Sequence, residues 1–167
     1  MSDSPATVQA LSETAQVEQL LTSARSAMRE FVHADQARVD EAVTALAWSV
    51  YKPEHATELA ELAVADTGIG NVRDKITKNQ RKTFGTLRDL SRVKTVGVIE
   101  EQPELGLIKY AKPVGVVAAV TPSTNPAATP VNKAMMAVKG RNAVIVASTS
   151  SESAPPKASQ SAFSGTG

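Results

Sequence analysis

The stretch KPVGVVAAVTPSTNPAATPVNKAMMAVKGRNAVIVA, residues 112–147, decides the fold. Two short apolar runs within it, 115–120 and 142–147, have the length and composition typical of strands buried on both faces of a parallel sheet. Residues 130–139 between them have the apolar spacing of a helix, and Gly140 marks its end. Strand, helix and strand in this order predict a βαβ unit with a right-handed crossover.

The turn after the first predicted strand carries the candidate site. Ligands of open α/β sheets bind beyond the carboxyl ends of the strands, and this turn follows such an end. Pro122 and Pro126 stiffen it by fixing φ, and Ser123, Thr124 and Asn125 offer short polar groups. The amide of Asn125 can stabilise a developing oxyanion without carrying a charge. An asparagine in a turn, however, most often bonds its own backbone.

Helical periodicity dominates the chain before residue 96. In the first helical stretch Leu20, Met28 and Phe31 are the expected core residues. In the last, Gly85 costs about 1 kcal/mol relative to alanine and disfavours one continuous helix. The expected helices are 8–32, one that follows an N-cap at Asp35, one that begins at Pro53 and ends at Gly68, and 71–92.

Two extended segments, 96–100 and 105–112, flank Gln102-Pro103-Glu104 and predict a hairpin-like pair. The expected fold class is therefore α/β: N-terminal helices, an extended β pair and a βαβ unit of a doubly wound sheet. Residues 11–147 form the expected folded unit. Residues 1–10 are small and polar, and residues 148–167 are rich in Ser, Ala and Pro, so we expect both segments to be disordered.

The composition argues against several classes of site and partner. The sequence has no cysteine, and His33 and His55 are too far apart for a metal motif, so they are expected at the surface and no metal site is expected. Aromatic residues are few and the net charge is +1, so the basic run 73–82 is interpreted as a solvated helix face and not as a nucleic-acid site. Neither a signal peptide nor a membrane-spanning stretch is evident, and we expect a cytoplasmic protein with no membrane partner.

The run PVGVVAAVTPSTNP, residues 113–126, resembles the signature of the aldehyde dehydrogenase superfamily, in which a Pro-x-Gly-Val strand leads to a Pro-flanked turn with an asparagine. The form TPSTNPAAT resembles the CoA-acylating branch, of the sulfoacetaldehyde dehydrogenase type, because the hydrolytic branch usually has Trp-Asn in this turn. Residues 140–146, GRNAVIV, are similar to the next strand of the family. The resemblance covers about residues 10–147 and implies the first βαβ unit of a doubly wound NAD(P)-binding domain, truncated.

The resemblance also implies a function and roles for individual residues. The family oxidises an aldehyde with NAD or NADP, and its acylating branch passes the acyl group to CoA. Asn125 would be the oxyanion-hole amide. The wall of the cofactor cleft would be lined by Thr121, Pro122, Ser123 and Thr124. Ser148 would lie on the adenine-ribose side of the cofactor, where acylating members usually have a Ser-Pro motif.

The family's nucleophile is a cysteine thiolate, and the 167 residues contain none. We therefore expect the chain alone to be inactive, as a truncated form whose reading frame is lost near Ala147. The alternative is a non-catalytic remnant that acts in oligomerisation or partner binding, because 96–112 resembles the oligomerisation arm of a family that forms homo-oligomers. Lys133 matches a helix lysine of many members, which implies a supporting role, but an exposed helix residue is the more common interpretation.

Overall fold

Helices form the first part of the chain, of which the computed structural model describes residues 12–148. The helices are α1 (Glu13–Phe31), α2 (Gln36–Tyr51), α3 (Pro53–Thr67) and α4 (Val72–Ser91). Side-chain oxygens of Ser12, Asp35 and Asn71 cap α1, α2 and α4 by accepting a backbone N–H of the first turn. The N-cap predicted at Asp35 is confirmed. The terminal segments predicted to be disordered lie outside the described residues, except Ser148.

The connections between the helices follow the sequence signals. Pro53 occupies the first turn of α3, and Gly68 ends that helix in the left-handed conformation, with φ 64°. Helix α4 continues through Gly85, against the expectation of an interruption there. Packing against α2, α3 and α5 outweighs the low helix propensity of that one glycine.

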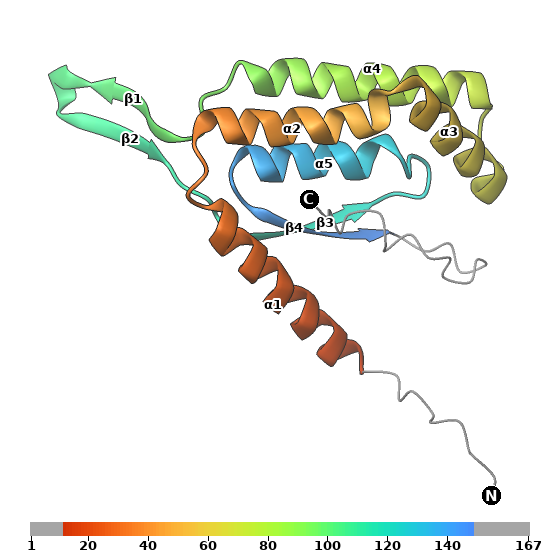
Figure 1. The fold of residues 1–167 in the computed structure, drawn as a ribbon, viewed down its shortest axis with the longest axis horizontal. Helices are drawn as coiled ribbons and strands as arrows, with labels where there is room; N and C mark the ends of the chain where they lie inside the picture. Colours follow the sequence, from red (N-terminus) through yellow and green to blue (C-terminus); the bar gives the residue numbers. More distant parts are fainter. Residues whose placement is uncertain (1–11, 149–167) are drawn as a thin grey trace, which may run out of the picture.

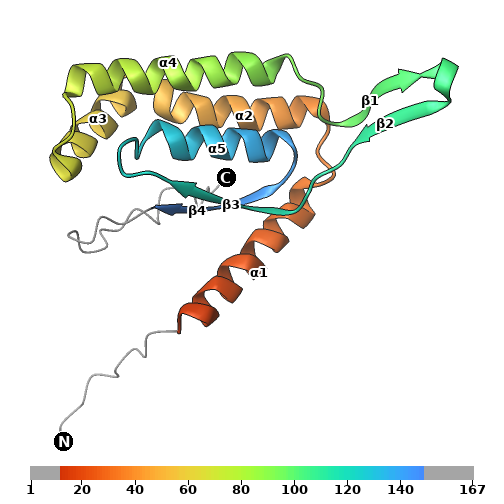
Figure 2. The ribbon, with the colours of Figure 1, turned by 180° about the vertical axis from the view of Figure 1, so that it is seen from behind.

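The extended pair forms a hairpin, as predicted. Strands β1 (Gly97–Gln102) and β2 (Leu107–Ala111) are antiparallel and are joined by the short 3-10 turn η1 (Pro103–Leu105). Glu100 and Lys109 form an ion pair of 2.6 Å across the strands, and Lys109, followed by Gln102, lowers the pKa of the Glu100 carboxyl. The hairpin projects away from the helices and from the second sheet (Figures 1 and 2).

The predicted βαβ unit is present. Strands β3 (Val116–Thr121) and β4 (Ala143–Ser148) pair in parallel, from Val116 opposite Ala143 to Thr121 opposite Ser148, and α5 (Ala128–Lys139) connects them. Helix α5 lies between this sheet and the layer of α2 and α4, while α1 crosses the opposite face (Figures 1 and 2). The layers are therefore, in order, α2 with α4, then α5, then the sheet of β3 and β4, and then α1.

The core lies on the helical side of the sheet. Met135 of α5 is fully buried, and Leu46, Leu59, Leu87, Leu90 and Val138 surround the core cluster. This places residues of α2, α3, α4 and α5 around one apolar centre. The cluster itself consists of Val43, Ala47, Val50, Val131 and Met135.

The prediction that both strands are buried on both faces is wrong for residues 12–148. Ala119 and Thr121 are buried beneath α5, but Val120 is 57% and Val146 is 44% exposed. The physical reason is coverage: α5 shields one side of β3, and α1 reaches only part of the opposite face. The chain therefore exposes apolar sheet surface that a complete doubly wound sheet would cover with helices.

One expectation for the helix faces is wrong, and a second holds only in part, since Arg73, Arg81 and Lys82 of the basic run are exposed. Helix α1 has no fully buried residue, and Leu20 is half exposed, while Met28 and Phe31 are only partly buried. In α4 the basic run is not simply a solvated face, because Lys75 and Asn79 within it are buried. The neighbouring helix α3 buries only alanines, whose small side chains leave room for longer ones on α4. No described helix is long and apolar enough to span a bilayer.

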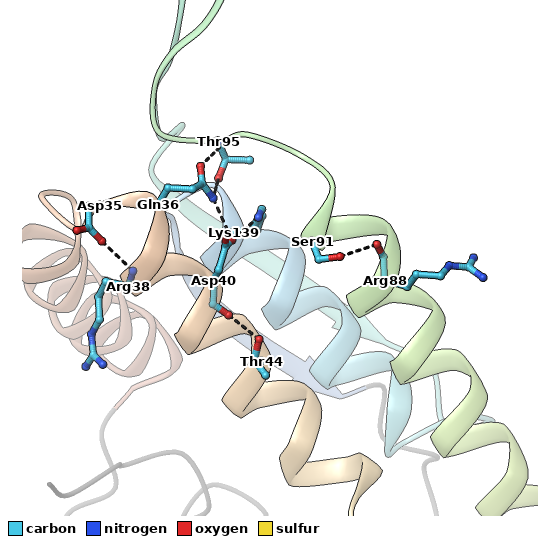
Figure 3. Close-up of polar contacts among 9 residues, drawn as sticks. All are labelled: Asp35, Gln36, Arg38, Asp40, Thr44, Arg88, Ser91, Thr95 and Lys139. Carbon is cyan, nitrogen blue, oxygen red and sulfur yellow. Dashed lines mark hydrogen bonds and ion pairs between the residues drawn. The ribbon is translucent and has the colours of Figure 1, made fainter.

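A polar network ties three segments together at the amino-terminal end of α2 (Figure 3). The ammonium group of Lys139, from α5, is buried and pairs with the Asp40 carboxylate, which also accepts a 2.9 Å bond from the Gln36 amide. The side-chain oxygen Oε1 of Gln36 accepts a hydrogen bond from the backbone N–H of Thr95 at 2.8 Å. The network thus fixes α5 and the segment after α4 to α2.

We expect Asp40→Ala to destabilise the chain by about 2 kcal/mol, because it leaves the Lys139 cation buried without its carboxylate partner. Urea unfolding followed by circular dichroism measures the change. Glu41→Ala is the matched control: it breaks the Arg38–Glu41 pair, whose side chains are 65% and 68% exposed, and should cost less than about 0.5 kcal/mol. Equal losses for the two variants would contradict the assignment.

Candidate functional site

The candidate site lies where the two parallel strands end. We call this side of the sheet, formed by the carboxyl ends of β3 and β4, the carboxyl edge. Thr121 and Ser148 end β3 and β4 and stand opposite each other in the register. The turn to α5 leaves from the same edge, which faces away from the hairpin (Figure 1). The sheet therefore brings the two segments of the predicted site to one edge, where open α/β sheets bind ligands.

The opposite end of β3 is held by the residues between α5 and β4. The side-chain oxygen of Asn142 accepts the backbone N–H groups of Val114 at 2.6 Å and Gly115 at 3.0 Å. Arg141, with φ 57°, donates to the carbonyls of Val32 at 2.7 Å and Ala111 at 3.1 Å. The sequence GRN at 140–142 thus fixes where β3 starts, and with it where the turn lies.

The turn itself is short and leaves the Asn125 amide available. The backbone N–H of Asn125 donates to the carbonyl of Pro122 at 3.3 Å, which closes a β-turn. The Asn125 side chain is half-buried, and no residue of 12–148 is hydrogen-bonded to it. The common role of a turn asparagine, bonding its own backbone, is therefore not the one found here. Pro122, Ser123 and Thr124 are exposed beside it.

Thr121 and Ser148 differ in what they can offer a ligand. Thr121 is 3% exposed, and its hydroxyl donates to the Ala147 carbonyl at 3.2 Å, so that bond joins the two strand ends. Ser148 is exposed and belongs to β4, one residue beyond the predicted limit of the folded unit. Among residues 12–148, the exposed hydroxyls at this edge are therefore those of Ser123, Thr124 and Ser148.

Lys133 is a residue whose contact the sequence did not predict. Its side chain is only partly exposed, and its ammonium group donates to the carbonyl of Val120, at the end of β3. Lys133 precedes the buried Ala137 by four residues, so both lie on the same face of α5. This helical spacing is the feature of the sequence that could have predicted an inward-facing lysine. Lys133 therefore brings a positive charge close to the candidate site.

The groups at this edge suit a ligand with carbonyl or hydroxyl groups better than a metal ion. Asn125 supplies an uncharged donor, Ser123, Thr124 and Ser148 supply hydroxyls, and Lys133 supplies a cation. These groups fit an oxyanion and the polar parts of a nucleotide. Within 12–148 no three His, Cys, Asp or Glu side chains converge on one point. His33 and His55 are exposed, as predicted.

The model of the aldehyde dehydrogenase family matches residues 2–161. The chain belongs to the aldehyde dehydrogenase family. The acylating sulfoacetaldehyde dehydrogenase of Cupriavidus necator is 59% identical over 128 residues, which are 77% of this chain and 26% of that enzyme. The chain thus spans about a quarter of the length of this relative.

Several solved structures share the fold. An acetylating aldehyde dehydrogenase from Geobacillus thermoglucosidasius is 37% identical, with a TM-score of 0.77 over 81% of this chain and 29% of that one. An engineered glycolyl-CoA reductase with bound NADP+ is 22% identical, with a TM-score of 0.63 over 78% of this chain and 29% of that one, and shows the fold alone. The resemblance drawn from residues 113–126 and 140–146 and the α/β fold class are confirmed.

We expect Thr121→Val to destabilise this aldehyde dehydrogenase segment by about 1 kcal/mol, because valine keeps the shape of the side chain but cannot donate to the Ala147 carbonyl. Urea unfolding measures the loss. Thr44→Val is the control, since the exposed Thr44 hydroxyl bonds only the carbonyl one turn earlier, and it should change stability by less than about 0.5 kcal/mol. A neutral Thr121→Val would show that this hydroxyl does not join the strand ends.

Proposed function

We propose that residues 112–148 are the first βαβ unit of the NAD(P)-binding domain of an acylating aldehyde dehydrogenase, which converts an aldehyde to an acyl-CoA. The observation that carries the proposal is the Asn125 amide, which is held at the carboxyl edge of the sheet with no partner among residues 12–148. The similarity to the acylating enzymes of C. necator and G. thermoglucosidasius supports the acylating branch. Residues 12–148 would be one part of a larger domain.

In this proposal each site residue either contacts the substrate or cofactor, or holds another part of the site in place. Asn125 donates an N–H to the oxygen of the aldehyde carbon as negative charge develops there. Pro122 keeps the turn rigid, Ser123 and Thr124 form the wall of the cofactor cleft, and Thr121 holds that wall to β4. A nicotinamide cofactor bound in this cleft would supply the hydride acceptor for the oxidation. The 167 residues contain no cysteine, so the thiolate that attacks the aldehyde must come from elsewhere.

The end of β4 fits either nicotinamide cofactor. In doubly wound dinucleotide domains an acidic residue near this position binds the ribose 2′-hydroxyl of NAD and disfavours a 2′-phosphate. Here β4 ends with Ala147 and the exposed Ser148, neither of which carries a charge. A serine hydroxyl can bond a ribose hydroxyl or a phosphate oxygen, so we propose NAD or NADP as cofactor and CoA as the acyl acceptor.

A chimera tests the proposal in a complete subunit. Residues 10–147 replace the matching region of the C. necator enzyme, and acyl-CoA formation is followed through NADH or NADPH absorbance. We expect the chimera to be active, and Asn125→Ala in it to lower kcat about a hundred- to a thousandfold, with little change in the KM for the cofactor, as for loss of one oxyanion donor.

The matched variant in the chimera is Thr44→Val. The exposed Thr44 hydroxyl bonds the Asp40 carbonyl within α2, so its loss should leave kcat within about twofold of the parent. A chimera that turns over equally fast with Asn125→Ala would reject the oxyanion role. A fall in cofactor affinity with unchanged kcat would instead make Asn125 a cofactor-binding residue.

The hairpin supports a second function, in assembly. Ile108 is 55% and Tyr110 is 58% exposed, and Leu105 and Leu107 are exposed by half or more. A two-stranded ribbon with exposed apolar side chains and open edges suits addition to the sheet of another subunit. We therefore propose that the hairpin β1–β2 joins subunits of a homo-oligomer, and it would do so whether or not the chain takes part in catalysis.

We expect Ile108→Glu to reduce self-association of the 167-residue chain by placing a charge in that contact, measured as molar mass by light scattering during size-exclusion chromatography. The comparison is Leu62→Glu, a residue of α3 that is 53% exposed and should leave the molar mass unchanged. The same oligomer with and without Ile108→Glu would exclude the hairpin as the subunit contact.

A further inference from the structure

Three aromatic side chains form an exposed strip where α2 and α4 lie side by side (Figures 1 and 2). The ring centres of Trp48 and Tyr51, at the end of α2, are 6.0 Å apart, and Tyr51 is 6.0 Å from Phe84 of α4. The exposed fractions of the three residues are 55%, 36% and 53%. The Gln80 amide donates to the Tyr51 backbone carbonyl at 3.1 Å and joins the two helices there. We call Trp48, Tyr51 and Phe84 the aromatic seam.

The aromatic seam lies outside the core of the helical layer. Val43, Ala47 and Val50 are the α2 residues that pack around Met135, and helical geometry places Trp48 on the other side of α2. The chain has only six aromatic residues, one Trp, two Tyr and three Phe, so half of them meet in this strip. A single exposed apolar side chain is ordinary, but a contiguous group of them marks an interaction surface.

The charged residues one turn from Trp48 and Phe84 are all cations. Arg81 and Arg88 lie one turn before and one turn after Phe84, so the three share a face of α4. Lys52 lies one turn after Trp48. Trp, Tyr and Arg are the residue types that contribute most to the binding energy of protein interfaces. The surface around the aromatic seam is therefore both apolar and positively charged.

These cations are available to a partner. Arg81 is exposed and forms no ion pair within residues 12–148. Arg88 pairs with Asp89 at 2.9 Å, but the two side chains are 56% and 68% exposed, so this pair contributes little and can be exchanged for a partner's carboxylate. The other nearby carboxylate in the sequence, Glu54, belongs to α3, which starts beyond the bend at Pro53. Positive charge of this kind favours an acidic partner and disfavours a basic one.

We propose that the aromatic seam binds an acidic amphipathic helix of a partner protein. The 6.0 Å spacing of successive rings is close to the pitch of an α-helix, about 5.4 Å, so apolar side chains one turn apart on the partner would each meet one ring. Arg81 and Arg88 are two turns apart and would pair with carboxylates at the same spacing on the partner. None of these residues belongs to the carboxyl edge, so the inference is independent of the proposed function.

The contacts between the rings favour a protein helix over a nucleic acid. Bases stack on open ring faces. Tyr51 contacts a ring on each side, with 30° and 40° between the ring planes, which leaves less of its own face for a base. A protein helix needs only the exposed ring edges, and aromatic side chains have few rotatable bonds to immobilise on binding.

Trp48 is the only tryptophan of the chain, so its fluorescence reports on this surface directly. The probe is a synthetic peptide of about 15 residues, long enough for a helix, with Leu one turn apart on one face, Glu beside them and no Trp. We expect this peptide to shift the Trp48 emission of the 167-residue chain to shorter wavelength in a saturable way, because binding removes water from the ring. The affinity should fall as salt is raised.

Arg81→Glu should weaken peptide binding about tenfold or more, because like charges then face each other. Lys82→Glu is the matched control, since it makes the same change in charge on the same helix. Lys82 is exposed but stands two residues from Phe84, a spacing that a helix places on a different face, so binding should change less than about twofold. Circular dichroism of both variants confirms that they fold.

An absent or unsaturable shift with the Glu peptide would overturn the inference, as would equal weakening by Arg81→Glu and Lys82→Glu. A shift produced instead by phosphatidylserine vesicles or by oligothymidine would overturn it in favour of a membrane or a nucleic acid. A shift that grows with protein concentration and needs no peptide would overturn it in favour of a second copy of the chain. Because the readout is Trp48 emission, an inactive chimera would reject the proposed function and leave this inference standing.

Discussion

The side chain of Asn142 sets the position of everything that follows β3. Its oxygen holds the N–H groups of Val114 and Gly115, its amide nitrogen donates to the carbonyl of Ala137, and Arg141 beside it bonds the ends of α1 and β2. These bonds join the start of β3, the end of α5 and the base of the hairpin at one point. The parallel register with β4 then carries this position along the sheet to Thr121 and the turn.

The two ends of the sheet consequently have different roles, one structural and one that can bind a ligand. The amino-terminal end is closed by hydrogen bonds and by the buried pair of Lys139 and Asp40, which hold the helical layer to the βαβ unit. The carboxyl end keeps polar groups that the described residues leave unbonded, above all the Asn125 amide. A binding site needs polar groups that are fixed in position but are not already hydrogen-bonded within the protein. The hydrogen bonds at the amino-terminal end of the sheet fix its position, so the polar groups at the carboxyl end can stay unbonded.

Local signals in the sequence predicted the elements well. The N-cap at Asp35, the helix end at Gly68, the hairpin around Pro103 and the strand–helix–strand order of 115–147 depend on neighbouring residues and are found as expected. Burial was predicted less well, because it depends on what covers each face. A run of valines indicates a buried strand only when helices lie on both of its sides, and here Val120 and Val146 are exposed.

At the candidate site, too, local features could be predicted from the sequence, whereas contacts between distant segments could not. The motif located Asn125 and its turn, since prolines and a strand end are local features. The motif could not show that the Thr121 hydroxyl is directed to the Ala147 carbonyl, 26 residues away, or that Lys133 reaches back to the end of β3. Both contacts cross from one element of the βαβ unit to another, and they exist only once the strands are in register.

The exposed apolar surfaces have one common physical explanation. Apart from the aromatic seam, they lie on the outer faces of β3 and β4 and on the hairpin, where no other element of residues 12–148 covers them fully. Surfaces of this kind are rare on isolated domains because they attract other chains. The family relatives are several times longer than the matched region, and a longer polypeptide or a second subunit would bury them. The core around Met135 needs neither, because it is enclosed by four helices of this chain. Within residues 12–148 the apolar surface is therefore buried where helices meet and exposed on the sheet faces and the hairpin.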